Sequence, residues 1–196
     1  MNWLLFALCS WVCFGAQLGL SKHLSAGSGD IYPSFVIPLL VYVSLHATPR
    51  AALWAALVLG CLADLADLAN THAMSTGSVM QVLGPSALGY LVAAQLVISL
   101  RGMVLAQNFF TPIILNLVAA FVAGLVVVAI FTLRSFYQDQ IDWQPANRLI
   151  IVGGSALYTA VIAIPVTILL HLASPWFGFT TQHSQHRVGH ARAFKR

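Results

Sequence analysis

The sequence contains no glutamate, and charged residues of every kind are scarce. Only 7% of the 196 residues are charged, whereas a soluble domain has about 25%. Hydrophobic residues make up 59% of the chain, so water is not its main solvent. The few acidic residues are all aspartates: Asp30, Asp64, Asp67, Asp139 and Asp142. This composition excludes a water-soluble globular domain and predicts an all-α integral membrane protein.

Cysteine and the motifs of catalysis are also nearly missing. The three cysteines, Cys9, Cys13 and Cys61, lie inside apolar segments. They form no C-x-x-C pair and have no histidine at metal-ligand spacing, so we interpret them as small packing residues. The sequence contains no phosphate-binding loop, zinc signature or catalytic triad pattern. We therefore expect a protein that is not an enzyme and that binds no cofactor or metal.

Long apolar runs are what the sequence does have. About 20 apolar residues make one membrane-spanning helix, and six such runs fill most of residues 1–178. We expect these residues to form one transmembrane domain, followed by a basic, disordered cytoplasmic tail at 179–196. The six runs cover residues 3–20, 32–47, 51–66, 79–100, 109–133 and 148–172.

Proline and polar residues set the expected ends of these helices. Pro38 removes a backbone donor and is expected to interrupt the second helix. Gly84-Pro85 is expected to break the start of the fourth helix, so that its regular part begins near Ser86. The polar stretch 67–78 is expected to be a solvated loop between the third and fourth helices.

The distribution of lysine and arginine predicts the orientation. If the N-terminus is cytoplasmic, six spans leave Lys22, Arg134 and Arg148 outside. The positive-inside rule then favours two cytoplasmic ends. The basic tail is expected to contact anionic membrane lipid, at about 1 kcal/mol per residue near the surface, and no aromatic pattern points to nucleic acid. The six basic residues placed inside are Arg50, Arg101, Arg187, Arg192, Lys195 and Arg196.

Small residues recur every four positions along the third apolar run. Ala52, Ala56, Gly60 and Asp64 share one helix face at this spacing. A stripe of small residues lets a second helix approach closely, so it predicts a packing surface. Asp64 lies at the far end of this stripe and is the only charged residue in the interior of a predicted span.

A charged side chain at the centre of a membrane costs at least ~2.5 kcal/mol, which makes Asp64 a candidate functional residue. Our first hypothesis is that Asp64 accepts hydrogen bonds from the broken backbone before Ser86. The alternatives are an interfacial position near the helix end and a metal site shared with Asp67 and His72. The other polar residues in the spans are expected to hydrogen-bond neighbouring helices; they are Gln81, Gln95 and Asn116.

Four sequence features follow one another between residues 33 and 101. Pro33 precedes an apolar helix, Pro49-Arg50 precedes the next, and a G-x-x-x-D pattern from Gly60 to Asp64 closes it. A run from Leu83 to Leu91, with the sequence LGPSALGYL, then opens the following helix, which Arg101 ends. In these features and in the number and order of spans, the chain resembles the family of the rod shape-determining protein MreD.

The resemblance implies a fold similar to the substrate-binding subunits of energy-coupling-factor transporters. It also implies a non-enzymatic component of the bacterial cell-elongation machinery in the inner membrane. Relatives bind MreC and, through it, MreB, RodA and a class B penicillin-binding protein. Two other classes stay open: a subunit of a membrane transporter that binds a vitamin-type small molecule, and a membrane enzyme of lipid metabolism. The structural or interaction candidates are Arg50, Ala52, Ala56, Gly60, Asp64, Gly84, Pro85, Gly89 and Arg101.

Overall fold

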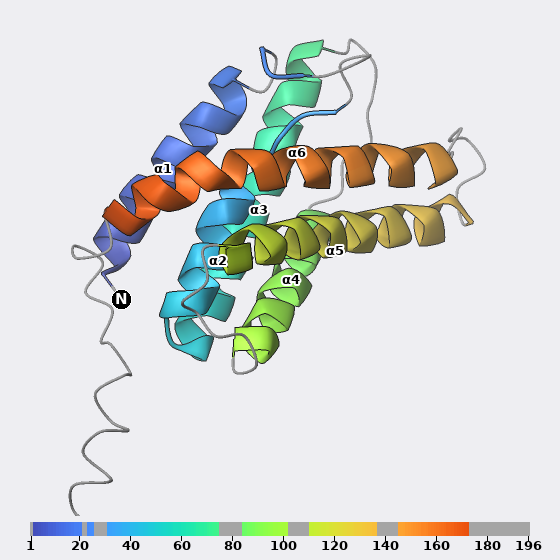
Figure 1. Ribbon diagram of the computed structural model, residues 1–196. Helices are drawn as coiled ribbons and strands as arrows, with labels where there is room; N and C mark the ends of the chain where they lie inside the picture. Colours follow the sequence, from blue (N-terminus) through green and yellow to red (C-terminus); the bar gives the residue numbers. More distant parts are fainter. Residues whose placement is uncertain are drawn as a thin grey trace, which may run out of the picture.

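The computed structural model describes residues 2–20, 23–25, 31–74, 84–101, 110–136 and 145–172, with the backbone alone at 67–74, 110, 135 and 145. Six helices lie in these ranges, in the predicted order (Figure 1). The predicted tail at 179–196 lies outside the described residues. The helices are α1 Trp3–Leu20, α2 Val36–His46, α3 Pro49–Met74, α4 Pro85–Arg101, α5 Phe110–Ser135 and α6 Pro145–Leu172.

Four of these helices are long and apolar enough to cross a membrane. Their apolar parts are Trp3–Leu20, Pro49–Ala66, Thr111–Arg134 and Ala146–Leu172. The two shorter apolar helices are α2 and α4. Many large apolar side chains are exposed on the described surface, an arrangement that suits lipid rather than water. The helices therefore agree with the expectation of an all-α membrane protein.

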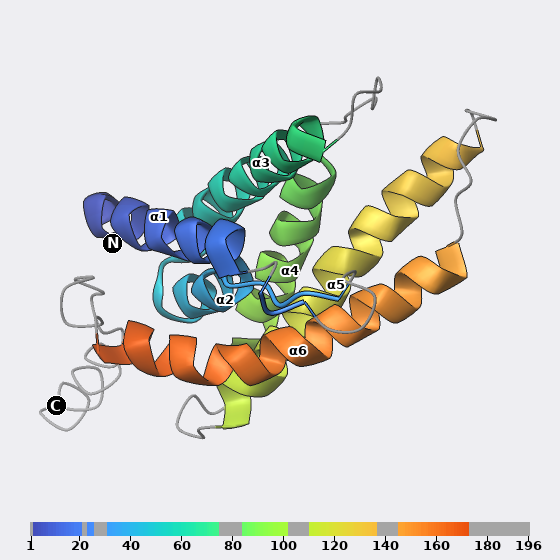
Figure 2. The same ribbon diagram turned by 90° about the horizontal axis from the view of Figure 1, so that it is seen from above.

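The short helix α2 lies at the centre of the molecule. It has 11 residues, so it is roughly 16 Å long, about half the thickness of a hydrocarbon core. All of its residues from Val36 to Ser44 are buried. It packs against each of the other five helices, and Figure 2 shows it enclosed among them. A helix that is apolar all round must be buried in this way.

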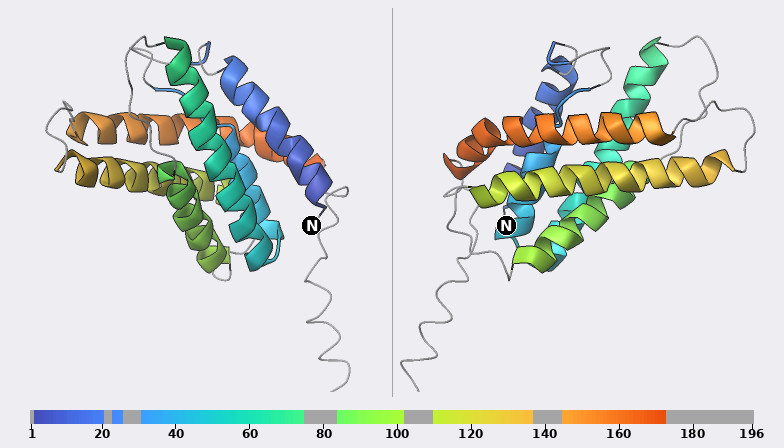
Figure 3. Two further views of the ribbon diagram at one scale, coloured as in Figure 1. Left: turned by 180° about the vertical axis from the view of Figure 1, so that it is seen from behind. Right: turned by 45° about the vertical axis from the view of Figure 1, so that its right-hand side comes forward.

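Helices α3 to α6 pack in chain order, each against the next. Figures 1 and 3 show α5 and α6 side by side, crossing the direction of α3 and α4. Small residues allow these close contacts. A Cβ atom on Gly89 of α4 would lie 2.8 Å from the carbonyl oxygen of Ala123 in α5. A Cβ atom on Gly124 of α5 would lie 2.5 Å from the side chain of Val152 in α6.

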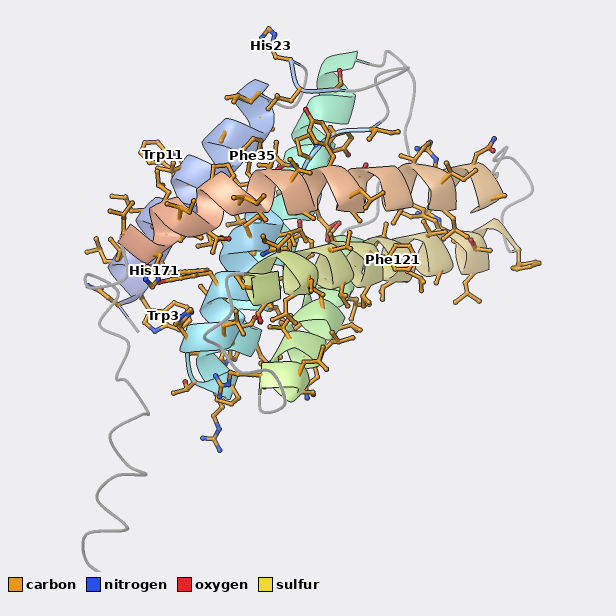
Figure 4. The ribbon with its side chains drawn as sticks, viewed as in Figure 1. Trp3, Trp11, His23, Phe35, Phe121 and His171 are labelled. Atoms are coloured by element: carbon orange, nitrogen blue, oxygen red, sulfur yellow. The ribbon has the colours of Figure 1, made fainter. Side chains whose placement is uncertain are left out.

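Helix α1 lies at the edge of the molecule and packs mainly on α2. Within α1, the buried residues are Phe6 and Ser10, whereas Trp11 is 79% exposed. Figure 4 shows Trp11 on the outer side of α1, away from the other helices. The outer face of α1 is therefore a broad apolar surface of the kind that faces lipid.

The third helix is longer than the sequence pattern predicted. Residues 67–74 belong to α3, so the expected solvated loop over 67–78 is wrong for this part; residues 75–78 lie outside the described residues. Polar residues mark where a helix leaves an apolar environment, but they do not end it. No glycine or proline occurs between Gly60 and Gly77, so the backbone has no local reason to stop at residue 66.

The second helix also differs from its prediction. It begins at Val36 rather than near residue 32, and Pro38 does not interrupt it. Pro38 is the third residue of α2, where a backbone N–H has no partner within the helix, so its missing donor costs little. The predicted break at Gly84-Pro85 is confirmed, because α4 begins at Pro85. Since α2 is too short to cross a bilayer alone, six complete spans stay a prediction.

Candidate functional site

Asp64 lies at the N-terminus of α4 and accepts hydrogen bonds from its backbone. The Gly84 N–H donates to Oδ2 over 2.8 Å, and the Ser86 N–H donates to Oδ1 over 3.1 Å. The Ala87 nitrogen lies 3.4 Å from Oδ2. The first N–H groups of a helix have no partner within it, and the helix dipole favours an anion there. The predicted hydrogen bonds between Asp64 and the broken backbone are therefore confirmed.

The Gly84-Pro85-Ser86 sequence gives the backbone the shape that this contact needs. Gly84 has a φ of +126°, a conformation that side chains rarely allow. Pro85 is the first residue of α4, where its fixed φ suits the helix and its missing N–H is no loss. The two close donors thus stand on either side of a residue that cannot donate, and one carboxylate binds both.

Close packing of α3 on α4 brings Asp64 within reach of these donors. Gly60 lies one turn before Asp64 on the same helix face. A Cβ atom on Gly60 would clash with the Cα atom of Ala87 and lie 2.9 Å from the carbonyl oxygen of Ser86. Ala52 and Ala56 continue the stripe and are completely buried. The stripe is therefore a packing surface, and at Gly60 it permits backbone contact with α4.

Arg101 caps the C-terminal end of the central helix. Its Nη1 donates to the carbonyl oxygen of Ala47 over 2.7 Å and lies 3.4 Å from that of Leu45. The last carbonyl groups of a helix lack partners within it, and the dipole favours a cation there. Arg101 was a candidate only through the family resemblance, and no sequence pattern paired it with α2.

The N–H groups just before α2 are capped by side chains of the first and last helices. The Phe35 N–H donates to Oε1 of Gln17 in α1 over 2.8 Å. The Ser34 N–H donates to Oγ1 of Thr159 in α6 over 3.0 Å, and this hydroxyl donates to the Ser155 carbonyl over 2.7 Å. Sequence reasoning missed both caps. The available signal was that Gln17 and Thr159 are isolated polar residues inside apolar runs.

The predicted candidates divide into one cluster and several separate positions. Gly89 packs against α5, and Arg50 is exposed at the start of α3. Neither residue contacts the Asp64 carboxylate. The residues that the structure brings together at the α3–α4 contact are Gly60, Asp64, Gly84 and Pro85.

Two polar residues of the spans do not make the predicted interhelical hydrogen bonds. Asn116 donates from Nδ2 to the Pro112 carbonyl of its own helix over 2.7 Å. Its Oδ1 and the Ser44 hydroxyl are buried without a hydrogen-bond partner among the described residues. Gln95 is exposed on α4, and Gln81 lies outside the described residues.

The polar side chains of this site hydrogen-bond backbone groups at or near helix ends. Within the described ranges, no three histidine, cysteine or acidic side chains are grouped so that they could hold a metal ion. Asp67 and His72 belong to the part of α3 that is described by its backbone alone. The alternative of a metal site with Asp64 therefore stays a sequence hypothesis.

No protein-family model, curated protein or solved structure matches this chain.

Proposed function

We propose that this protein is a non-enzymatic membrane component of the bacterial cell-elongation machinery, related to MreD and located in the inner membrane. Its role is to maintain rod shape by binding MreC and, through it, MreB, RodA and a class B penicillin-binding protein. The observation that carries the proposal is the contact between two sequence motifs of the resemblance, the G-x-x-x-D pattern and the sequence that opens α4.

The two motifs lie 20 residues apart in the chain and satisfy each other in space. Gly60 permits backbone contact with Ala87, and Asp64 accepts hydrogen bonds from Gly84 and Ser86. Each oxygen of the Asp64 carboxylate is thus engaged by a backbone donor at the start of α4. This arrangement favours a structural role for the motifs, as expected of a protein that acts by binding other membrane proteins.

In this proposal α2 and α4 complete a set of six spans. Helix α4 has 17 residues and is therefore roughly 25 Å long. The shorter α2 is extended by the non-helical residues 31–35. Irregular backbone is tolerated at membrane depth where protein satisfies its polar groups. The caps from Gln17 and Thr159 do so for Phe35 and Ser34.

A vitamin-type transporter subunit is the competing class. Such a protein needs an enclosed pocket with a few convergent polar groups. Two hollows of the described surface are open and lined mainly by leucine side chains of α3 and α4. The polar residues of the predicted outer loops, including Asp30, Asp139 and Trp143, lie outside the described residues. No observation on the described part of the chain favours the transporter class.

The test is affinity purification of the tagged full chain in mild detergent, followed by mass spectrometry. An unrelated multi-pass protein with the same tag is the control. We expect MreC and RodA to be enriched over the control, and depletion of the protein to make rod-shaped cells round. Enrichment of a pair of ATPases without MreC, with normal cell shape on depletion, would refute the proposal in favour of the transporter class.

A further inference from the structure

Helices α3 and α4 form an open apolar groove on the surface of the protein. Two adjoining hollows, of about 600 Å³ and about 230 Å³, share Leu53 of α3 and Leu91 of α4. Leu57 and Leu96 extend the apolar lining on the two helices. We call this continuous feature the α3–α4 groove. It opens on the outer surface of the helices, where Trp54 beside it is 63% exposed.

The polar residues of the α3–α4 groove gather at one end. The contact of Gly60 with Ala87 fixes the register of the two antiparallel helices. From this contact, Arg50 lies ten residues back along α3, roughly 15 Å away. Gln95 lies eight residues on along α4, roughly 12 Å away in the same direction, and Ser99 lies one turn further. All three polar residues line the groove.

This polar end is the end that the charge pattern places at the cytoplasmic surface. Arg50 precedes the apolar part of α3, and Arg101 ends α4. Arg101 is already bound to the Ala47 carbonyl. Arg50, in contrast, is exposed, and no acidic side chain of the described residues faces it across the groove. The Ser99 hydroxyl donates to the Gln95 carbonyl of its own helix over 2.9 Å. The end of the groove thus presents a positive charge and an amide to an apolar channel.

We infer that the α3–α4 groove binds one anionic phospholipid of the bilayer. Its phosphate lies at Arg50, with the Gln95 amide beside the headgroup and the glycerol region. An acyl chain lies along the leucines toward Leu57 and Leu91. Charge complementarity selects an anionic over a zwitterionic lipid, because basic residues near a membrane surface attract anionic headgroups. Trp54 lies one helical turn from Arg50, at the depth where tryptophan anchors favour the interface.

The order of groups along the groove favours lipid over a helix of another protein. A phospholipid carries its charged headgroup in the interfacial region and its acyl chains in the hydrocarbon core, so its site is polar near the membrane surface and apolar deeper in the bilayer. Here the polar groups cluster within about two turns of the cytoplasmic end, and the deeper lining is apolar. The inference uses only this surface, so it does not depend on the proposed role in cell elongation.

The test uses the full chain in nanodiscs of phosphatidylcholine that contain a small fraction of phosphatidylglycerol. Native mass spectrometry after gentle release counts the retained lipids. We expect wild-type protein to retain one phosphatidylglycerol molecule in preference to phosphatidylcholine. Arg50→Gln should lower this preference about fivefold, which corresponds to the loss of one basic contact. The matched control is Arg148→Gln, which removes an exposed arginine at the start of α6 and should leave the preference unchanged.

A second readout locates the lipid. Brominated phosphatidylglycerol quenches tryptophan fluorescence on contact, and the part of the signal from Trp54 is the difference between wild type and Trp54→Phe. We expect Trp54 to be quenched more by the brominated anionic lipid than by brominated phosphatidylcholine, and this difference to vanish in Arg50→Gln. Equal retention by Arg50→Gln and wild type would overturn the inference. So would a dimer or a copurified helical protein that excludes lipid from the groove.

Discussion

Asp64→Asn and Asp64→Leu separate a structural carboxylate from an active one. Asp64 is 7% exposed, and its two oxygens accept from Gly84 and Ser86 over 2.8 and 3.1 Å. A buried donor that loses its acceptor costs about 1–3 kcal/mol. Asp64→Leu orphans both donors, which gives a loss of about 2–6 kcal/mol. The lost charge at the helix N-terminus adds about 0.3–1 kcal/mol.

Asp64→Asn should be milder. The amide keeps one acceptor oxygen but turns an NH₂ group toward the second donor, so about half of the loss remains. We therefore expect the stability order wild type, Asp64→Asn, Asp64→Leu. The assay is thermal unfolding of the purified protein in detergent, together with complementation of cell shape. Leu65→Ala, at an exposed neighbour on α3, is the control for a change of side-chain volume.

Two outcomes would refute this reasoning about Asp64. In the first, Asp64→Asn unfolds as readily as Asp64→Leu, which means that the remaining oxygen stabilises nothing. In the second, Asp64→Asn is as stable as wild type yet abolishes function in cells. The carboxylate would then have an active role, such as carrying a proton or binding a partner, and the helix-capping account would fail.

Three further predictions follow from the packing and the charge pattern. Gly60→Ala should lower the free energy of unfolding by about 1–3 kcal/mol or more, as overpacking does, because the new Cβ atom would meet backbone atoms of Ala87. Thermal unfolding measures this loss. The control is Gly153→Ala, whose Cβ atom would meet nothing within 4 Å and should leave the stability unchanged. Arg101→Leu should lower the free energy of unfolding by about 1–3 kcal/mol, because the Ala47 carbonyl loses its donor. Arg101→Lys should restore part of this free energy in the same thermal unfolding assay. Equal losses in the two variants would exclude the cap. Topology reporters fused after Gly27, Ser75 or Gln138 should give a signal from outside the cell membrane. A cytoplasmic signal from the fusion after Ser75 would contradict the orientation.

The caps at the N-terminal end of α2 explain why so few polar residues suffice in this fold. A helix of 11 residues that ends within a membrane domain exposes unpaired N–H and C=O groups at both ends. At its start the Ile37 N–H lies 3.4 Å from the Ser34 hydroxyl, and Gln17 and Thr159 bind the N–H groups of the two residues just before the helix. At its end Arg101 binds the Ala47 carbonyl. The polar side chains that make these contacts are therefore part of the scaffold.

The sequence by itself determined the features that depend on local composition. Apolar runs of spanning length give the membrane class and the six helices, and Gly84-Pro85 breaks the chain because of its own backbone preferences. The four-residue spacing of Ala52, Ala56, Gly60 and Asp64 was enough to predict a packing face and to pair the carboxylate with a nearby helix start. The packing face depends only on residues that are close in the sequence, and the carboxylate pairs with the start of the very next helix along the chain.

Only the tertiary structure decided the features that depend on residues far apart in the chain. Nothing local shows that α2 is enclosed by five helices, that Gln17 and Thr159 bind the residues just before it, or that Arg101 binds the carbonyl group just after it. Such contacts depend on where each helix packs, because an unpaired backbone group takes whichever side chain the fold brings to it. The sequence also misplaced the end of α3, since polar residues report a change of solvent and not the end of a helix.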